Sequence, residues 1–117
     1  MKMVVAIIRP EKLEAVQQAL NERDVYLMTV SDVRGCGRQR GYTEVYRGSE
    51  FQVRLLPKLK LEIAVTDAFV EATIEAIVHA ARTPETGQIG DGKIFVLPLD
   101  DCVRIRTGER GSQAIGP

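Results

Sequence analysis

The sequence predicts an α+β domain of the ferredoxin-like class, with the order strand, helix, strand, long loop, strand, helix, strand. Two observations carry this prediction: two segments repeat apolar residues with the period of a helix, and four short segments show strand patterns. The expected product is a four-stranded antiparallel sheet with both helices on one face. The 117 residues suffice for one compact domain and are too few for two, so we assign residues 1–117 to a single domain.

The first half of the chain begins with a strand and a helix. Residues 3–8 form a short continuous apolar run rich in β-branched side chains, which is typical of a strand covered on both faces. Pro10 suits the first position of a helix, which is expected to end near residue 24. The apolar stripe of this helix consists of Leu13, Val16 and Leu20. A second strand is expected over about 25–34.

The second half repeats this order after a long loop. Residues 35–41 are glycine-rich and basic, and no core pattern returns until about residue 55, which is typical of a functional loop. Apolar and charged residues then alternate over 59–65 and predict a half-buried strand. A helix follows, with Asp67 as its expected N-cap and Pro84 at its end. Its apolar stripe consists of Val70, Ile74, Ile77, Val78 and Ala81.

The end of the chain offers fewer apolar residues. The last strand is expected at 94–97, and the tail over 108–117 has little to pack and is expected to be mobile. The sheet face away from the helices must be either covered or solvated. We expect four apolar residues on this face, where they favour self-association: Met28, Val30, Ile63 and Val65.

The bulk composition argues against several classes of protein. Sixteen basic and sixteen acidic residues cancel, so no global field attracts the chain to nucleic acid or to a membrane surface. Cys36 and Cys102 show no disulfide framework and no metal-type spacing, so reduced thiols are expected. The apolar run at 3–8 is too short for a signal peptide, and no run reaches the roughly 18 apolar residues of a membrane span. We therefore expect a soluble, cytoplasmic protein.

A glycine-rich cassette at residues 87–93, Gly-Gln-Ile-Gly-Asp-Gly-Lys, is the strongest functional signal in the chain. Glycines let the backbone approach a ligand closely, and the nearby cations Lys93, Arg104 and Arg106 can neutralise anionic oxygens. The cassette therefore predicts phosphate binding. Ile94 stands where a P-loop needs Ser or Thr, and a strand follows instead of a helix, which argues against a P-loop ATPase. Nucleotide binding through a different loop geometry is expected.

Over essentially all of its length, the chain resembles the P-II family of nitrogen-regulatory signal transduction proteins. The resemblance is carried by Thr29-Val30 and by the segments 35–50, 90–95 and 104–109. It implies a homotrimer of ferredoxin-like subunits, with ATP or ADP bound in each cleft between neighbours. It also implies three loops: the T-loop at about 37–55, the glycine-rich B-loop at about 84–93 and the C-terminal loop at about 104–117.

The resemblance implies a regulator and not an enzyme. A protein of this kind senses 2-oxoglutarate together with ATP and Mg²⁺, and its T-loop projects from the body to dock on targets. The implied partner is an ammonium transporter, which would recruit the protein to the membrane, or an enzyme of nitrogen assimilation.

The resemblance also assigns roles to particular residues. Those expected to bind the nucleotide are Thr29, Gly35, Gly37, Arg38, Gly90, Asp91, Gly92, Lys93, Arg104 and Arg106. Those expected to bind 2-oxoglutarate are Gln39, Arg40, Gly41 and Lys58, and Gln39 would also give an oxygen to Mg²⁺. Those expected to contact partner proteins are Tyr42, Tyr46, Arg47, Ser49 and Phe51. General chemistry agrees with these roles. Mg²⁺ takes few protein ligands when it bridges phosphates, and a dianionic keto acid needs a fixed cation.

Three positions in the chain bear on its regulation. Phe51 stands where many bacterial relatives carry a tyrosine that is uridylylated, so this modification cannot occur at that position. Ser49 matches a serine that is phosphorylated in some relatives, and Arg47 matches an arginine that plugs the transporter pore. Residues 84–86 resemble a short insertion before the glycine loop, which should change a surface turn and leave the phosphate contacts intact.

Three other functions compete with this one on the same residues: an adenylate sensor, a slow ATP hydrolase and an RNA-binding module. The chain could sense the ratio of ATP to ADP without responding to 2-oxoglutarate, or it could hydrolyse ATP slowly with Asp91 as a base. The same order of elements also builds RNA-binding domains. That function requires aromatic residues on the central strands and a basic sheet face, whereas this chain is 5% aromatic with zero net charge.

Overall fold

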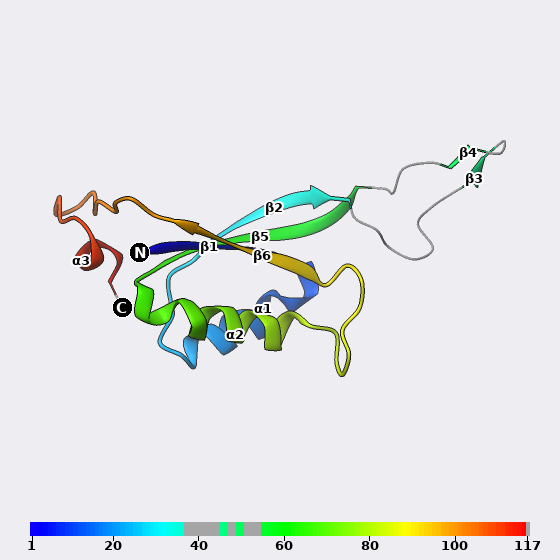
Figure 1. Cartoon of the computed structure of the whole chain (residues 1–117), viewed down its shortest axis with the longest axis horizontal. Coiled ribbons are helices and arrows are strands. Elements are labelled where there is room, and N and C mark those ends of the chain that lie inside the picture. Colours follow the sequence, from blue (N-terminus) through cyan, green and yellow to red (C-terminus); the bar gives the residue numbers. More distant parts are fainter. Residues whose placement is uncertain (37–44, 47–48, 51–54, 117) are drawn as a thin grey trace.

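The computed structural model describes residues 1–36, 45–46, 49–50 and 55–116. Four strands form one sheet in the order β2-β5-β1-β6, and every neighbouring pair is antiparallel (Figure 1). These strands are β1 (Lys2–Ile8), β2 (Thr29–Gly35), β5 (Leu56–Val65) and β6 (Gly92–Pro98). The predicted ferredoxin-like arrangement is therefore confirmed. Two short strands, β3 (Val45–Tyr46) and β4 (Ser49–Glu50), pair with each other in a separate sheet.

The two main helices lie side by side on one face of the four-stranded sheet (Figure 1). Each is entered through a single 3-10 turn, and the first of these turns starts at Pro10, as its fixed φ angle favours. The helical segments are η1 (Pro10–Lys12), α1 (Leu13–Asn21), η2 (Asp67–Phe69), α2 (Val70–Ala81) and α3 (Ser112–Ile115). None of the helices in the described part of the chain is long and apolar enough to span a membrane.

The hydrophobic core lies between the sheet and the two helices. Alternate residues of β1 and β5 point toward the helices, because side chains along a strand alternate between its faces. The sheet contributes Val4, Ala6, Ile8, Leu59, Leu61, Ile63 and Val65. The helices contribute Val16, Ala19, Leu20, Ala76, Ile77 and Ala81. The buried hydroxyl of Thr73 donates a 2.7 Å hydrogen bond to the Phe69 carbonyl, which satisfies the buried polar residue of α2.

The prediction of which residues make the opposite sheet face apolar is wrong. Ile63 and Val65 are 0% and 5% exposed because their positions in β5 point toward the helices. Met28 packs against the core, and Val30 lies opposite the core residue Leu61 and so shares its face. The residues that make the open face apolar come from β1 and β6 instead: Met3, Val5, Phe95 and Leu97.

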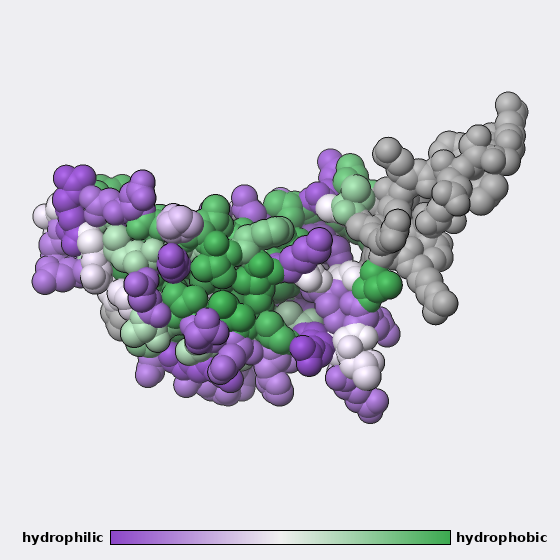
Figure 2. Space-filling view, in the orientation of Figure 1, coloured by the Kyte–Doolittle hydropathy of each residue, from purple (hydrophilic) through white to green (hydrophobic). Residues whose placement is uncertain are grey.

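A band of exposed apolar side chains crosses the edge strand β6 and α2 (Figure 2). The band contains Val78, Phe95, Val96 and Leu97, each between 38% and 50% exposed. β6 pairs only with β1, so its other edge is not covered by a described strand. An apolar band beside an open strand edge is typical of a surface that another protein chain covers.

Two further expectations from the sequence are wrong. β2 starts at Thr29 and not near residue 25, because Val25 closes the end of α1 by donating to the Leu20 carbonyl at 3.0 Å. The N-cap of η2 is Thr66 and not Asp67. The carboxylate of Asp67 instead accepts a 2.8 Å hydrogen bond from the Met1 ammonium group.

The C-terminal segment is packed, contrary to the expected mobile tail. Ile115 on α3 is 6% exposed, and an isolated bridge joins Val103 to Arg110. Asp101 stabilises this segment, because its carboxylate accepts hydrogen bonds from Arg110 Nε at 2.9 Å and from the Gly111 N–H at 3.2 Å. Polar contacts therefore hold the tail in place. Such contacts leave no periodic pattern of apolar residues in the sequence, so the sequence did not predict them.

Candidate functional site

The glycine cassette forms the loop between α2 and β6 and lies at the end of the sheet where β2 ends and β5 begins (Figure 1). Gly90 and Gly92 have φ angles of +102° and +119°, which side chains other than glycine rarely adopt. Gly92 also lies against β1, where an added Cβ would be 1.8 Å from the Ile7 carbonyl oxygen. Glycine is therefore required where the loop enters β6.

Asp91 is at the centre of the hydrogen bonds within this loop. Its Oδ1 accepts from Arg9 Nε at 3.1 Å and from Thr83 Oγ1 at 2.6 Å. Its Oδ2 accepts from the backbone N–H groups of Thr83 and Gln88, both at 2.9 Å. Burial alone raises the pKa of Asp91, but the hydrogen bonds from Thr83, Gln88 and Arg9 outweigh it and hold the pKa well below its ordinary value. The carboxylate is therefore ionised at neutral pH.

Two cations bind carbonyl groups of the same loop. Arg9, which follows β1, donates from Nη2 to the Ile89 carbonyl at 3.1 Å. Lys58, on β5, donates from Nζ to the Gly90 carbonyl at 2.7 Å. Burial and the neighbouring charge of Arg9 lower the pKa of Lys58, while Glu11 and Asp91 partly oppose this effect. The loop is thus held from two strands that are distant from it in the sequence.

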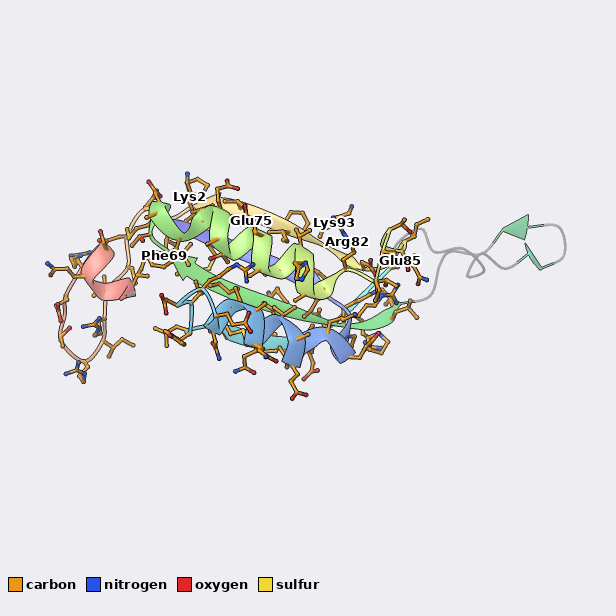
Figure 3. All side chains as sticks on the ribbon, turned by 90° about the horizontal axis from the view of Figure 1, so that it is seen from below. Lys2, Phe69, Glu75, Arg82, Glu85 and Lys93 are labelled. Carbon is orange, nitrogen blue, oxygen red and sulfur yellow. The ribbon has the colours of Figure 1, made fainter. Side chains whose placement is uncertain are left out.

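A hollow of about 640 Å³ lies between this loop, α2 and β6. Its lining includes the apolar side chains of Ile77, Val78 and Ile94 and the cations Arg82 and Lys93. Figure 3 shows Arg82, Glu85 and Lys93 together at the loop end of α2 and β6, with Lys2 and Phe69 at the opposite end. A volume of this size and a wall with few polar groups are typical of small-molecule sites.

The structure brings only part of the predicted nucleotide site together. Gly90, Asp91, Gly92 and Lys93 form the loop, and Lys58 contacts it directly. Gly35 at the end of β2 is also close, because a Cβ added there would be 3.8 Å from Lys58 Cγ. These residues share one end of the sheet.

Thr29, Arg104 and Arg106 lie at the other end of the sheet. Thr29 is the first residue of β2, whereas Gly35 is the last. Arg104 and Arg106 follow the far end of β6, so the length of a seven-residue strand, about 20 Å, separates them from the loop (Figure 1). One chain by itself therefore does not assemble the predicted set of residues.

Arg104 is already engaged within its own segment. Its guanidinium donates to Glu109 Oε1 at 2.9 Å and to the Gln113 carbonyl at 2.8 Å. These contacts close the turn that carries Arg106, an exposed side chain, and Ile105, which is fully exposed. The turn thus presents a cation and an apolar side chain outward.

Several predicted residues lie outside the described residues: Gly37, Arg38, Gln39, Arg40, Gly41, Tyr42, Arg47 and Phe51. Tyr46 and Ser49 belong to β3 and β4, of which the backbone is described. The suggested insertion at 84–86 forms an exposed turn in which Glu85 has a φ of +76°.

Arg9 and Thr83 are the site residues that sequence reasoning missed. Arg9 reaches the loop because Ile8, the residue before it, lies opposite Gly92 in the sheet. The available signal was a cation directly after the first strand, but its meaning depends on the register between β1 and β6. Thr83 lies immediately before Pro84, which we interpreted as the end of a helix.

Comparison with known proteins agrees with this architecture. The family model described as "Nitrogen regulatory protein P-II" matches residues 1–109. The chain is 54% identical to the nitrogen regulatory protein P-II of Rhizobium etli over 98% of this chain and 100% of that protein. It is 56% identical to the protein of the same name from Synechocystis, with the same coverage. It is 53% identical to the nitrogen regulatory protein GlnK1 of Methanosarcina mazei, over 98% and 97% of the two chains.

Replacing Gly92 by alanine should distort the junction of the loop and β6. The added Cβ would overlap the Ile7 carbonyl, and the positive φ adds a strain of about 1–2 kcal/mol. We expect a loss of at least about 2 kcal/mol in the free energy of unfolding, measured by urea denaturation. Gly108→Ala is the matched control, because it has a φ of +73° and no neighbouring atom within 4 Å. Equal losses in both variants would contradict the close approach to β1.

The ionisation of Asp91 should make stability depend on pH in one direction. Because its pKa in the folded chain lies below the unfolded value of about 3.9, its contribution is complete above that value. The contribution is lost as the pH falls through the folded pKa. The difference in free energy of unfolding between the unmodified protein and Asp91→Asn should be constant from about pH 7 to 5 and shrink below about pH 4. A difference unchanged down to about pH 3 would contradict this prediction.

Proposed function

The chain belongs to the P-II family of nitrogen regulatory proteins, and we propose that it acts by binding ATP or ADP between neighbouring subunits. The family consists of trimeric regulators that act on partner proteins. In our proposal, the glycine loop of one subunit and the arginine-bearing turn of its neighbour enclose the phosphates. The residues proposed to bind the nucleotide are Thr29, Gly35, Gly37, Arg38, Gly90, Gly92, Lys93, Arg104 and Arg106. Asp91 has a positioning role in this proposal.

The division of the binding residues between two ends of the sheet carries this proposal. Lys93 and the glycines are at one end, and Arg104 and Arg106 are at the other, about 20 Å away along β6. A nucleotide is too short to bridge both ends of one subunit with its phosphates. In a closed ring, by contrast, one end of each subunit meets the opposite end of the next. The exposed apolar band on β6 and α2 supplies a surface for such contacts.

The chemistry of the loop end suits a polyphosphate. Lys58 and Lys93 provide positive charge, and the glycines allow close approach of the backbone. Arg9 and Lys58 already hold carbonyl groups of the loop. The loop therefore loses little conformational entropy when a ligand binds. The loop therefore supports a preorganised phosphate site.

We propose that Mg²⁺ and 2-oxoglutarate bind beside the phosphates at the base of the T-loop. Gln39 would give an amide oxygen to Mg²⁺, and phosphate oxygens would supply further ligands, which suits a hard cation. The described residues contain no group of three or more His, Cys, Asp or Glu side chains that could hold a metal without the nucleotide. Lys58, joined by Arg40 and Gly41, would pair with a carboxylate of 2-oxoglutarate. The ion would supply charge neutralisation between the two anionic ligands.

The proposed output is a change in the T-loop and not a chemical reaction. Mg-ATP and 2-oxoglutarate would stabilise one conformation of the base of the T-loop, and ADP would permit another. The T-loop would therefore present a different binding surface to its partner in each state. Asp91 is a poor general base for hydrolysis, since both of its oxygens are occupied and its pKa is depressed. The proposed target is an ammonium transporter or a nitrogen-assimilation enzyme. Its contact residues would be Tyr42, Tyr46, Arg47, Ser49 and Phe51.

Calorimetric titration of 2-oxoglutarate should reveal binding with Mg-ATP and none with ADP or without nucleotide. Lys58→Ala should abolish this binding, because the keto acid loses its fixed cation. Lys60→Ala is the matched control, since Lys60 lies two residues along the same strand and is paired with Glu62. ATP that binds without any response to 2-oxoglutarate would contradict the proposed metabolite site and leave an adenylate sensor.

Mixed trimers should show that the nucleotide site is shared between subunits. Lys93→Ala and the double variant Arg104→Ala/Arg106→Ala should each lose ATP binding when assembled alone. In trimers that contain both, the intact loop of one subunit meets the intact arginines of a neighbour, so about one site in three should recover. Recovery is measured by titrating ATP into tag-purified mixed trimers. A site within one chain would give no recovery, which would overturn the proposed cleft.

A further inference from the structure

We propose that Asp91 positions the glycine loop for phosphate binding through Arg9 and Thr83, and does not itself contact the nucleotide. This inference rests on the proposed nucleotide binding. It assigns a function to a negative charge that stands in the middle of a site for an anion.

The hydrogen-bonding capacity of the Asp91 carboxylate is fully used within the protein. A carboxylate has about four acceptor positions, and the two oxygens of Asp91 accept four hydrogen bonds from Arg9, Thr83 and Gln88. Phosphate oxygens act mainly as hydrogen-bond acceptors at neutral pH, and a carboxylate only accepts, so the two groups gain little from each other. The side chain is 17% exposed and is therefore largely turned into the protein.

These hydrogen bonds join the end of β1 to two places in the connection between α2 and β6. Arg9 follows β1, Thr83 follows α2, and Gln88 lies within the loop. Gly87 leaves room for the carboxylate, because a Cβ at this position would be 3.3 Å from Asp91 Oδ2. The loop therefore closes around Asp91.

The contacts of Arg9 also fix the direction of a peptide group in the loop. Arg9 donates from Nε to the carboxylate of Asp91 and from Nη2 to the carbonyl of Ile89. In a trans peptide the carbonyl and the N–H point in opposite directions, so the N–H of Gly90 points away from Arg9. Asp91 holds the guanidinium in place and thereby fixes the orientation of a donor in the glycine loop. Correctly aimed backbone donors are the main requirement of a phosphate loop.

The positioning role and a passive role predict changes of opposite sign. If Asp91 were only a charge close to the phosphates, Asp91→Asn would remove repulsion and strengthen ATP binding. If Asp91 positions the loop, the same substitution weakens binding, because an amide donates where Arg9 and Thr83 already donate. The sign of the change in affinity therefore separates the two roles.

The test measures ATP affinity by calorimetry in the trimeric protein. Asp91→Asn should weaken ATP binding at least about tenfold, the scale of a lost hydrogen bond to a charged group. Asp24→Asn is the matched control, because Asp24 lies in an exposed connection after α1 and loses the same charge. It should leave the affinity unchanged. Equal or tighter binding by Asp91→Asn would overturn the proposal.

A second pair of variants tests the role through Thr83. Thr83→Val keeps the shape of the side chain and removes the hydroxyl that donates to Asp91 at 2.6 Å, whereas Thr83→Ser keeps the hydroxyl. ATP affinity should fall in the valine variant and recover in the serine variant. Unchanged affinity in Thr83→Val would overturn the proposal even if Asp91→Asn fails to fold. An unmodified protein that does not bind ATP would instead refute the proposed function.

Discussion

The pairing of β1 with a strand on each side is the constraint on which the rest of the structure depends. Ile8 lies opposite Leu59 of β5 and opposite Gly92 of β6. This register places the next residue, Arg9, beside the glycine loop, and it brings Lys58 of β5 to the same place. A shift of one residue would turn the core residues of β1 outward and separate both cations from the loop. Core packing and the geometry of the site are therefore set by the same hydrogen bonds.

Charge balance within the loop explains how an acidic residue can stand in the proposed anion site. The negative charge of Asp91 is compensated by Arg9 and by hydrogen bonds from the loop and from Thr83. Lys58 binds a carbonyl and not a carboxylate, so its positive charge is not neutralised by a direct ion pair among the described residues. The loop thus contains the balanced charge of Asp91, which fixes its shape, and it lies against the unbalanced charge of Lys58 on β5, which can attract a ligand.

The separation of the proposed binding residues between two ends of the sheet would link function to assembly. The loop end carries the glycines and Lys93, and the other end carries Thr29 and the turn held by Arg104. Neither end has the complete set, so occupancy of the proposed site depends on contact between subunits. In a regulator this dependence is useful, since a ligand in the cleft acts on two subunits at once.

The sequence by itself determined the order of the elements, the glycine loop and the family, because these follow from local periodicity, turn chemistry and residue identity. Leu61 and Ile77, for example, are core residues by periodicity alone. It did not determine which face Ile63 and Val65 occupy, that Arg9 and Thr83 hold Asp91, or that Ile115 is buried. These features depend on strand register and on contacts between residues far apart in the chain. Only the tertiary structure decides them, since a one-residue change in register reverses the face of a side chain without changing the local pattern.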